Sequence, residues 1–306
     1  MVKARDGEIR DSAKWVEEII HDFINRSPEN TLKNRSNDRA WDNPLVGFSR
    51  GDDPLFEKYR EYVASFHLTP LEIFNRTFPS IEVKPSELTV ISWILPQTKD
   101  TKADNRNETH YPSERWARAR IFGEEANEKL RSHVVNVLKD AGVEAVAPML
   151  APFWERRTSE KYGHASNWSE RHAAYASGLG TFGLCDGLIT PLGKAMRCGS
   201  VIARINITPT ERPYQNHHAY CLFYVDGTCR ECIKRCPAGA ITEAGHDKEK
   251  CQAYIHPGIE KYVEKQYGFM GYGCGLCQTG VPCESRNPVE KAESKRGHTS
   301  YGKSRF

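Results

Sequence analysis

The chain has 306 residues, of which 27% are charged, and a formal net charge of +3. This length allows two domains, or one large domain with an appendage, and so small a charge gives no reason to expect a nucleic-acid or membrane-surface protein. No stretch reaches the roughly 18–20 apolar residues of a membrane span, and residues 1–8 carry charges where a signal peptide has an apolar core. These features predict a cytoplasmic protein.

The first predicted element is a helix that begins near Asp11 and Ser12, which are suitable capping residues. Its apolar stripe recurs at helical spacing and consists of Trp15, Val16, Ile19, Ile20, Phe23 and Ile24. Residues 31–53 are polar and rich in turn formers. A second helix is expected from residue 54 to about residue 65, because proline at position 54 suits the first turn of a helix.

A buried strand and a long helix follow. Residues 88–95 are almost continuously apolar and are followed by a proline, which indicates a strand. The polar segment 97–111 is expected to be a loop, long enough for a lid or a binding role. Residues 113 to about 141 repeat apolar side chains at helical spacing up to a glycine, and residues 143–146 predict a short strand. The front of the chain is therefore mixed α and β.

The cysteines divide the chain chemically. All ten lie after residue 184, and eight of them fall between Cys221 and Cys283. In a reducing compartment, clustered cysteines bind metal more often than they form disulfides. We therefore expect a cysteine-free front and a metal-binding back.

A cysteine–proline run carries the strongest signal, and it consists of Cys229, Cys232, Cys236 and Pro237. Bacterial two-cluster ferredoxins use the run C-x2-C-x2-C-x3-C-P, whose last cysteine binds the other cluster. Asp226 occupies the position of the first cysteine in that run. Cys221, eight residues before Cys229, is the obvious substitute.

A second group of cysteines supplies the remaining ligands. In two-cluster ferredoxins the fourth ligand of each cluster comes from the other cysteine group, and the same exchange gives two sets of four ligands here. The first thiol set is Cys221, Cys229, Cys232 and Cys283. The second thiol set is Cys236, Cys251, Cys274 and Cys277. The sequence therefore predicts two [4Fe–4S] clusters.

Zinc is the alternative, because two C-x2-C pairs are also typical of a zinc ribbon. A ribbon separates its pairs by roughly 15–20 residues, whereas Cys232 and Cys274 lie much further apart. Zinc would also leave Cys236 and Cys283 without a role. We favour iron–sulfur, and we expect the two cysteines before this region, Cys185 and Cys198, to be ordinary buried thiols.

Three stretches together resemble the family of epoxyqueuosine reductases and reductive dehalogenases. The first is SERHAAYASGLGTFG at residues 169–183, which continues to residues 187–190. The others are the cysteine–proline run and YGCGLCQ at residues 272–278. Members of this family are cobalamin-dependent enzymes in which a nitroreductase-like core precedes a two-cluster ferredoxin module.

The resemblance implies an α+β protein with two domains and a tail. Residues 1–212 would form a nitroreductase-like catalytic domain that binds cobalamin. Residues 213–290 would form a ferredoxin-like domain with two [4Fe–4S] clusters, and residues 291–306 a polar, basic tail.

The resemblance also implies functional residues in the first of these stretches. Those expected to bind cobalamin are Trp168, Ser169, His172, Gly178, Gly180, Thr181, Phe182, Gly183 and Thr190. The glycine-rich part could pass close to a corrinoid face, or it could simply end a helix in a tight turn. Both interpretations stay open.

The catalytic candidates are Tyr162, His164 and Arg171. Family members usually carry an aspartate proton donor about six residues before the Glu-Arg pair, and His164 holds that place here. A phenol or an imidazole can donate a proton, or both could make only surface hydrogen bonds. Arg171 could bind an anion or pair with a carboxylate. Five residues separate Cys277 from Cys283 where the family usually has three, and these departures leave the substrate open.

We expect an oxidoreductase that reductively cleaves a C–O, C–halogen or related bond of a small molecule. The chain lacks the D-x-H-x-x-G segment through which many corrinoid proteins place histidine on cobalt, so we expect base-off cobalamin. The electron donor would be a soluble protein such as ferredoxin or flavodoxin, with no membrane partner. Nucleic acid is not expected, although a tRNA substrate stays open. The alternative is an electron-transfer protein that reduces a corrinoid or a partner without turning over a substrate.

Overall fold

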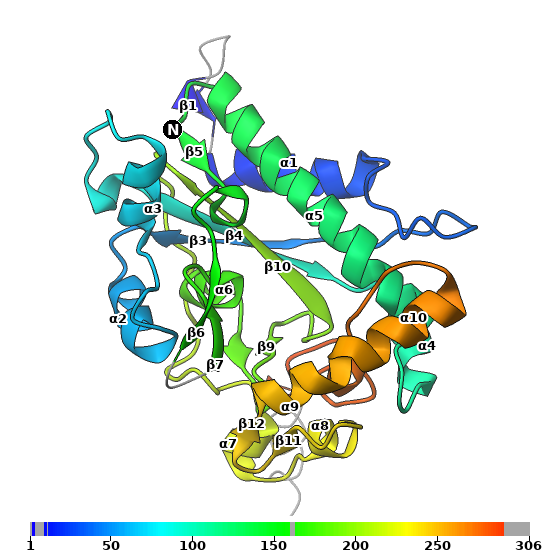
Figure 1. The fold of residues 1–306 in the computed structure, drawn as a ribbon. Coiled ribbons are helices and arrows are strands. Elements are labelled where there is room, and N and C mark those ends of the chain that lie inside the picture. The colour runs from blue at the N-terminus through cyan, green and yellow to red at the C-terminus, as the bar shows by residue number, and fades with distance from the viewer. Residues whose placement is uncertain (1, 4–8, 11, 160–162, 291–306) are drawn as a thin grey trace, which may run out of the picture.

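The computed structural model describes residues 2–3, 9–10, 12–159 and 163–290. At its centre is a four-stranded antiparallel sheet with helices on both faces (Figure 1). In spatial order its strands are β3 (Leu45–Arg50), β4 (Thr89–Pro96), β10 (Met196–Ala203) and β5 (Ala145–Val146). The mixed helix-and-sheet architecture predicted from the sequence is confirmed.

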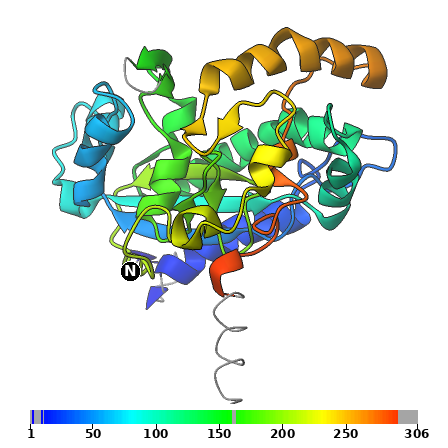
Figure 2. The same cartoon turned by 90° about the horizontal axis from the view of Figure 1, so that it is seen from below.

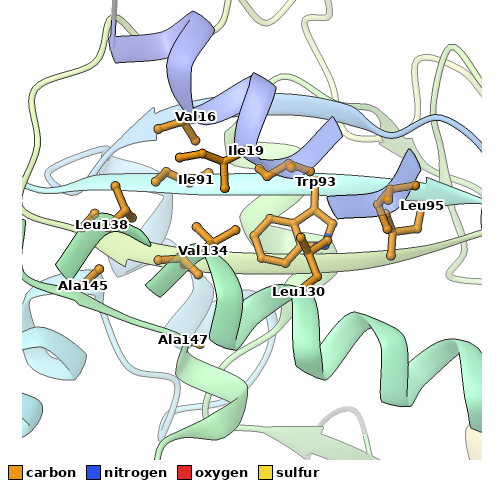
Figure 3. Close-up of a cluster of buried hydrophobic side chains, with 14 of the residues drawn as sticks. Val16, Ile19, Ile91, Trp93, Leu95, Leu130, Val134, Leu138, Ala145 and Ala147 are labelled. Atoms are coloured by element: carbon orange, nitrogen blue, oxygen red, sulfur yellow. The ribbon is translucent and has the colours of Figure 1, made fainter. Parts of the chain in front are cut away.

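Strand β4 is an inner strand, and all of its residues are buried. Successive side chains of a strand point to opposite faces of the sheet. Ile91, Trp93 and Leu95 therefore enter the larger hydrophobic core (Figure 3), whereas Val90 and Ile94 pack on the opposite face. Burial on both faces explains why the sequence of this strand is almost continuously apolar.

Helices α1 (Ser12–Arg26) and α5 (Glu114–Asp140) lie together on one face of the sheet (Figure 1). Ser113 caps α5, because its hydroxyl accepts a hydrogen bond from the backbone N–H of Trp116 at 3.3 Å. The helix ends just before Gly142, which has a φ of +78° that favours glycine. The predicted helices after residues 12 and 113 are confirmed.

Three shorter helices cover the opposite face: α2 (Pro54–Tyr62), α3 (Pro70–Thr77) and α6 (Glu170–Ala176). Asp53 caps α2 by accepting a hydrogen bond from the backbone N–H of Leu55 at 3.0 Å. The predicted second helix is confirmed, and it ends three residues earlier than expected. This face of the sheet carries the second hydrophobic core.

The prediction of a loop at residues 97–111 is wrong, because Lys99–Asn107 form helix α4. The Thr98 hydroxyl caps it by accepting a hydrogen bond from the backbone N–H of Thr101 at 3.3 Å. Buried polar contacts hold this helix, among them a 3.1 Å hydrogen bond from the Asn105 amide to the Thr279 hydroxyl. A helix held in this way has no apolar periodicity to detect. Strand β3 likewise lies inside the segment 31–53 that looked turn-rich.

The cysteine-rich back of the chain, residues 213–290, packs beside the core (Figures 1 and 2). Its elements are short: α7 (Leu222–Asp226), α8 (Glu231–Lys234), β11 (Ile241–Thr242), β12 (Gly245–His246), α9 (Lys248–Ala253) and α10 (Glu260–Tyr267). Helix α10 contacts α5, and the Tyr267 hydroxyl donates to the Pro112 carbonyl at 2.9 Å. The back therefore uses the start of α5 as a support.

The remaining strands pair in short ribbons: β1 (Val2–Lys3) with β2 (Ile9–Arg10), β6 (Arg156–Ser159) with β7 (Gly163–Ser166), and β8 (Thr181–Phe182) with β9 (Leu188–Ile189). Single helical turns occur at Pro85–Glu87, Pro148–Leu150, Tyr254–Ile259 and Leu276–Gln278. Strand β7 packs against α9, so the β6–β7 hairpin connects the front to the back. Within the described ranges, no helix is both long and apolar enough to cross a membrane.

A buried histidine makes the second core sensitive to pH. His67 is 1% exposed and lies between the rings of Tyr59 and Trp168. Neither ring nitrogen has a hydrogen-bond partner among the described residues. Burial lowers the pKa of His67 from its ordinary 6.5 to about 4. The folded protein therefore holds the neutral imidazole, whereas the unfolded chain binds a proton near pH 6.5.

We predict that the free energy of unfolding is fully maintained above pH 6.5 and falls as the pH drops from 6.5 to about 4. The shift corresponds to about 3 kcal/mol. His67→Phe keeps an aromatic ring and should reduce this slope in denaturant unfolding, leaving the part due to His172, whose pKa burial also lowers, whereas His110→Phe at an exposed position should keep the parent slope. An unchanged slope in His67→Phe would show that other groups cause the pH dependence.

Candidate functional site

The first thiol set lines one cavity, which contains all four of its members: Cys221, Cys229, Cys232 and Cys283. Cys221 directly precedes α7, and Cys232 lies within α8. The other walls are mostly apolar and include Leu184, Ile189, Leu222, Phe223 and Val281. Cys229 and Cys283 are 54 positions apart in the sequence but line the same cavity.

The second thiol set lines a second cavity, again with all four members: Cys236, Cys251, Cys274 and Cys277. This cavity has a volume of about 240 Å³. Trp41, Gln97 and Trp116 of the core form part of its wall, so it lies between the core and the back.

A glycine brings the second cavity against the core. Gly275 has a φ of +64°, and a Cβ atom there would lie 1.9 Å from the Trp116 ring. A side chain would therefore meet both backbone strain and a clash with α5. Gly273 is similar, because its Cβ would lie 2.8 Å from Cγ of Arg120. These glycines let the loop that carries Cys274 rest directly on α5.

The donor chemistry of both cavities fits [4Fe–4S] clusters. Each cavity is lined by one complete set of four thiols, which is the usual ligand set of such a cluster. Among the described residues, no group of three or more His, Cys, Asp or Glu side chains is arranged around a single metal ion. The structure brings together the same two thiol sets that the spacing predicted, and the ligation itself stays a prediction.

A fifth thiol lies between the two sets, contrary to the expectation of an ordinary buried thiol. Cys185 lines the second cavity and lies within hydrogen-bonding reach of the Cys232 and Cys277 thiols. Lys194 lines the first cavity, and its ammonium donates to the Cys185 sulfur at 3.2 Å. Hydrogen bonds from these two thiols, together with Lys194, hold the pKa of Cys185 well below its ordinary value. Cys198 is buried in β10, as expected.

Sequence reasoning missed this pair because neither residue belongs to a spaced motif. Cys185 has no partner cysteine nearby in the sequence, and Lys194 is one of many lysines. The only available signal was that Cys185 directly follows the family-like stretch. The contact of Cys185 with Lys194 is created by the fold and cannot be inferred from the position of Cys185 in the sequence.

Three arginines line the second cavity: Arg120, Arg171 and Arg197. Arg120 donates to the Tyr272 hydroxyl at 2.6 Å. Burial and the neighbouring Arg197 lower the pKa of Arg120 to about 10. No Asp or Glu is among the described residues that line this cavity, so its wall is cationic.

A buried ionic network fixes Arg197 at the cavity. Glu124 on α5 pairs with Arg197 and, at 3.0 Å, with Arg131. Arg131 is 1% exposed and also pairs with Glu170 at 3.2 Å. Burial alone would raise the pKa of Glu124, but the two guanidiniums lower it to about 2. Glu124 is therefore ionised, whereas burial raises the pKa of Glu170, and the network connects α5, α6 and β10.

The two predicted catalytic residues within the described ranges, His164 and Arg171, lie on different elements. His164 is exposed on β7, opposite Thr158 of β6. Arg171 lines the second cavity, and its guanidinium donates to the Asp186 carbonyl. Tyr162 lies outside the described residues.

The predicted cobalamin-binding side chains mostly contact the protein itself. The Trp168 indole stacks on Phe56 and donates to the Ser200 hydroxyl at 3.0 Å. Ser169 and His172 share a 2.8 Å hydrogen bond, and burial holds the pKa of His172 well below its ordinary value. None of these side chains lines the second cavity.

The rest of that stretch forms tight turns. Helix α6 ends before Gly178, which has a φ of +77° and approaches the Glu211 carbonyl. Gly180 likewise approaches the Ile189 carbonyl, so the helix-ending interpretation describes these glycines. The other predicted residues are placed as follows: Thr181 accepts from the Tyr220 N–H, Phe182 packs on His172, Gly183 lines the first cavity, and Thr190 donates to the Gly193 carbonyl.

Comparison with known proteins supports the resemblance. An epoxyqueuosine reductase from Bacillus anthracis is 30% identical over 120 residues, which are 37% of this chain and 29% of that protein. An epoxyqueuosine reductase from Gloeobacter violaceus is 34% identical over 125 residues, which are 38% of this chain and 36% of that protein. No family model matches the chain.

A catabolic reductive dehalogenase of known structure aligns with 93% of this chain and 39% of its own length, at 12% identity and a TM-score of 0.50. This likeness concerns the fold. Over about 120 residues the chain is similar in sequence to epoxyqueuosine reductases, which supports the resemblance that its motifs predicted. It spans about a third of the length of the curated relatives it matches.

We predict that the anaerobically reconstituted protein contains about eight iron and eight sulfide per chain. Cys221→Ala should lower both numbers toward four, because it removes one ligand of the first thiol set. Cys198→Ala removes a buried thiol outside both cavities and should keep all eight. Metal and sulfide analysis measures this. Eight iron in Cys221→Ala would exclude Cys221 as a ligand, and stoichiometric zinc without sulfide would exclude both clusters.

Proposed function

We propose that this protein is a cobalamin- and [4Fe–4S]-dependent reductase that cleaves a C–O, C–halogen or related bond. The observation that carries the proposal is the pair of cavities, each lined by one complete thiol set, with a cationic wall on the second. Two adjacent clusters can pass electrons in series from a soluble donor such as ferredoxin or flavodoxin. Relatives named epoxyqueuosine reductases support reductive chemistry.

In this proposal the arginines of the second cavity hold cobalamin. Guanidinium groups donate several hydrogen bonds in a fixed geometry and suit phosphate and carbonyl oxygens, both of which cobalamin carries. Arg120 and Arg197 are fixed by Tyr272 and Glu124, so they are oriented before a ligand binds. When bound, cobalamin would supply the reductive chemistry.

Proton delivery falls to the β6–β7 hairpin. The reduced carbon must receive a proton, and His164 stands on this hairpin, which packs against α9. Its exposed imidazole can exchange protons with solvent between turnovers. Tyr162 is the second candidate, and Arg171 would orient an anionic group at the second cavity.

The second candidate function is electron transfer without a small-molecule substrate. The two complete thiol sets favour it, because two adjacent clusters are sufficient for an electron carrier. Turnover separates the two functions. A reductase consumes a halogenated compound or an epoxyqueuosine-containing stem loop, whereas a carrier only reduces a second corrinoid protein.

We predict that the reconstituted protein binds cobalamin in the base-off state without a protein histidine on cobalt. Electron paramagnetic resonance of the Co(II) form measures this, since an axial nitrogen splits the cobalt signal. Arg120→Met should weaken binding at least tenfold, because it removes a fixed donor from the cavity wall. The exposed Lys234→Met variant is the control and should bind like the parent. Failure of the parent to bind any corrinoid would leave the carrier function.

We also predict that His164→Gln and Tyr162→Phe keep iron, sulfide and corrinoid but lose turnover. Loss of a positioned general acid lowers a rate by roughly 10²–10⁴-fold. Turnover of the substrate that proves active measures the effect, and His110→Gln at an exposed position is the control. If both variants turn over at the parent rate, the proton comes from elsewhere and the hairpin is structural.

A further inference from the structure

Lys194 and Cys185 form a buried pair in the wall between the two thiol-lined cavities. Lys194 is 2% exposed and lines the first cavity, whereas Cys185 is 6% exposed and lines the second. Their side chains meet at 3.2 Å. A lysine side chain rarely lies this deep without an anionic partner. Its ammonium has no carboxylate hydrogen bond or ion pair in the part of the chain that the structure describes.

The backbone holds Lys194 in this position. Its N–H donates to the Cys283 carbonyl at 2.8 Å, and the next N–H, of Ala195, donates to the Glu284 carbonyl at 3.2 Å. Gly193 allows this approach, because it has a φ of +88° and a Cβ there would lie 2.2 Å from the Glu284 oxygen. The segment around Lys194 is therefore joined to a member of the first thiol set. These bonds fix the backbone of Lys194 beside the first cavity, and the contact with Cys185 holds its ammonium.

We propose that the ammonium of Lys194, which lines the first cavity while its partner Cys185 lines the second, raises the reduction potential of the cluster in the first thiol set. This inference rests on the proposed function, because it requires that the thiols hold clusters. A [4Fe–4S] cluster with four thiolates is anionic and gains one further negative charge when it accepts an electron. A nearby cation stabilises the reduced form more than the oxidised form. Net charge, hydrogen bonds to sulfur and burial are the factors that set such potentials.

The position of the pair makes the effect local. The walls of the first cavity are mostly apolar, so solvent screens Lys194 weakly. Lys234 offers the opposite case, because it follows Cys232 by two residues but is 68% exposed and pairs with Glu231 at 2.8 Å. Two equal charges, one buried at the cavity wall and one exposed and paired, should therefore act very differently on the cluster. Each reduction adds one electron to a cluster, and neither Lys194 nor Cys185 forms or breaks a bond.

A redox titration of the full, anaerobically reconstituted chain, monitored by electron paramagnetic resonance, tests the proposal. Lys194→Met should keep about eight iron and shift the reduced-to-oxidised ratio of the first cluster at least tenfold toward oxidised. That is a fall of about 59 mV for one electron. Lys194→Arg keeps the charge and should stay near the parent, and Lys234→Met should shift the ratio less than threefold.

The other outcomes would overturn the proposal. A Lys194→Met potential equal to that of the parent would exclude the effect of charge. A fall in Lys194→Arg as large as in Lys194→Met would show that packing, not charge, is responsible. Loss of iron in Cys185→Ser would make Cys185 a ligand instead of the partner of Lys194. If Lys194→Met loses its clusters, the iron content of Lys194→Arg is compared with that of the parent. Parent-like iron in Lys194→Arg would support the role of charge, and loss of iron would show that packing is responsible. A parent that binds no iron refutes the proposed function and this inference together, whereas an unchanged potential refutes only the inference.

Discussion

One guanidinium joins the cysteine-rich back to the core, and both cavities depend on it. Arg235 stands between Cys232 and Cys236, so it belongs to the run that supplies ligands to both thiol sets. It donates to the Glu108 carbonyl at 2.8 Å and to the Asn105 carbonyl at 3.1 Å, at the end of α4, and to the Thr279 carbonyl at 3.0 Å. Carbonyls at a helix C-terminus attract a cation. One side chain thereby sets the distance between the cysteine–proline run, the loop after Cys277 and the core.

The core presents a matching surface because its own charges are paired in the interior. Glu124, Arg131 and Glu170 are held together where α5 and α6 meet β10. Removing one partner of such a network leaves a buried charge unpaired, which costs several kcal/mol, about 3–5. The network therefore acts less as a source of stability than as a constraint on position. Its outermost member, Arg197, reaches the second cavity with its orientation already fixed.

The sequence predicted the parts of this molecule that short-range patterns encode. Cysteine spacing identified both thiol sets, and apolar periodicity identified α1, α5 and β4. Helix α4 was missed because its contacts, such as the bond from Asn105 to Thr279, join residues 174 positions apart. The place of Cys185 was missed for the same reason. Among the predicted cobalamin-binding residues, Trp168 directly precedes the family-like stretch 169–183 but packs in the second core, since a motif identifies a segment and the fold decides which side chains face a cavity.

In the proposed function, the contrast between the two cavities would give the electron path a direction. Apolar walls disfavour the more negatively charged, reduced form of a cluster, and cations favour it. The first cavity has mostly apolar walls with the single cation Lys194, whereas three arginines line the second. The cluster in the first site would therefore have the lower reduction potential. Electron transfer from it to the second site, which the arginines line, would be downhill. Chemistry at the second cavity is consistent with this gradient, because the electrons arrive where the cationic wall can hold an anionic group.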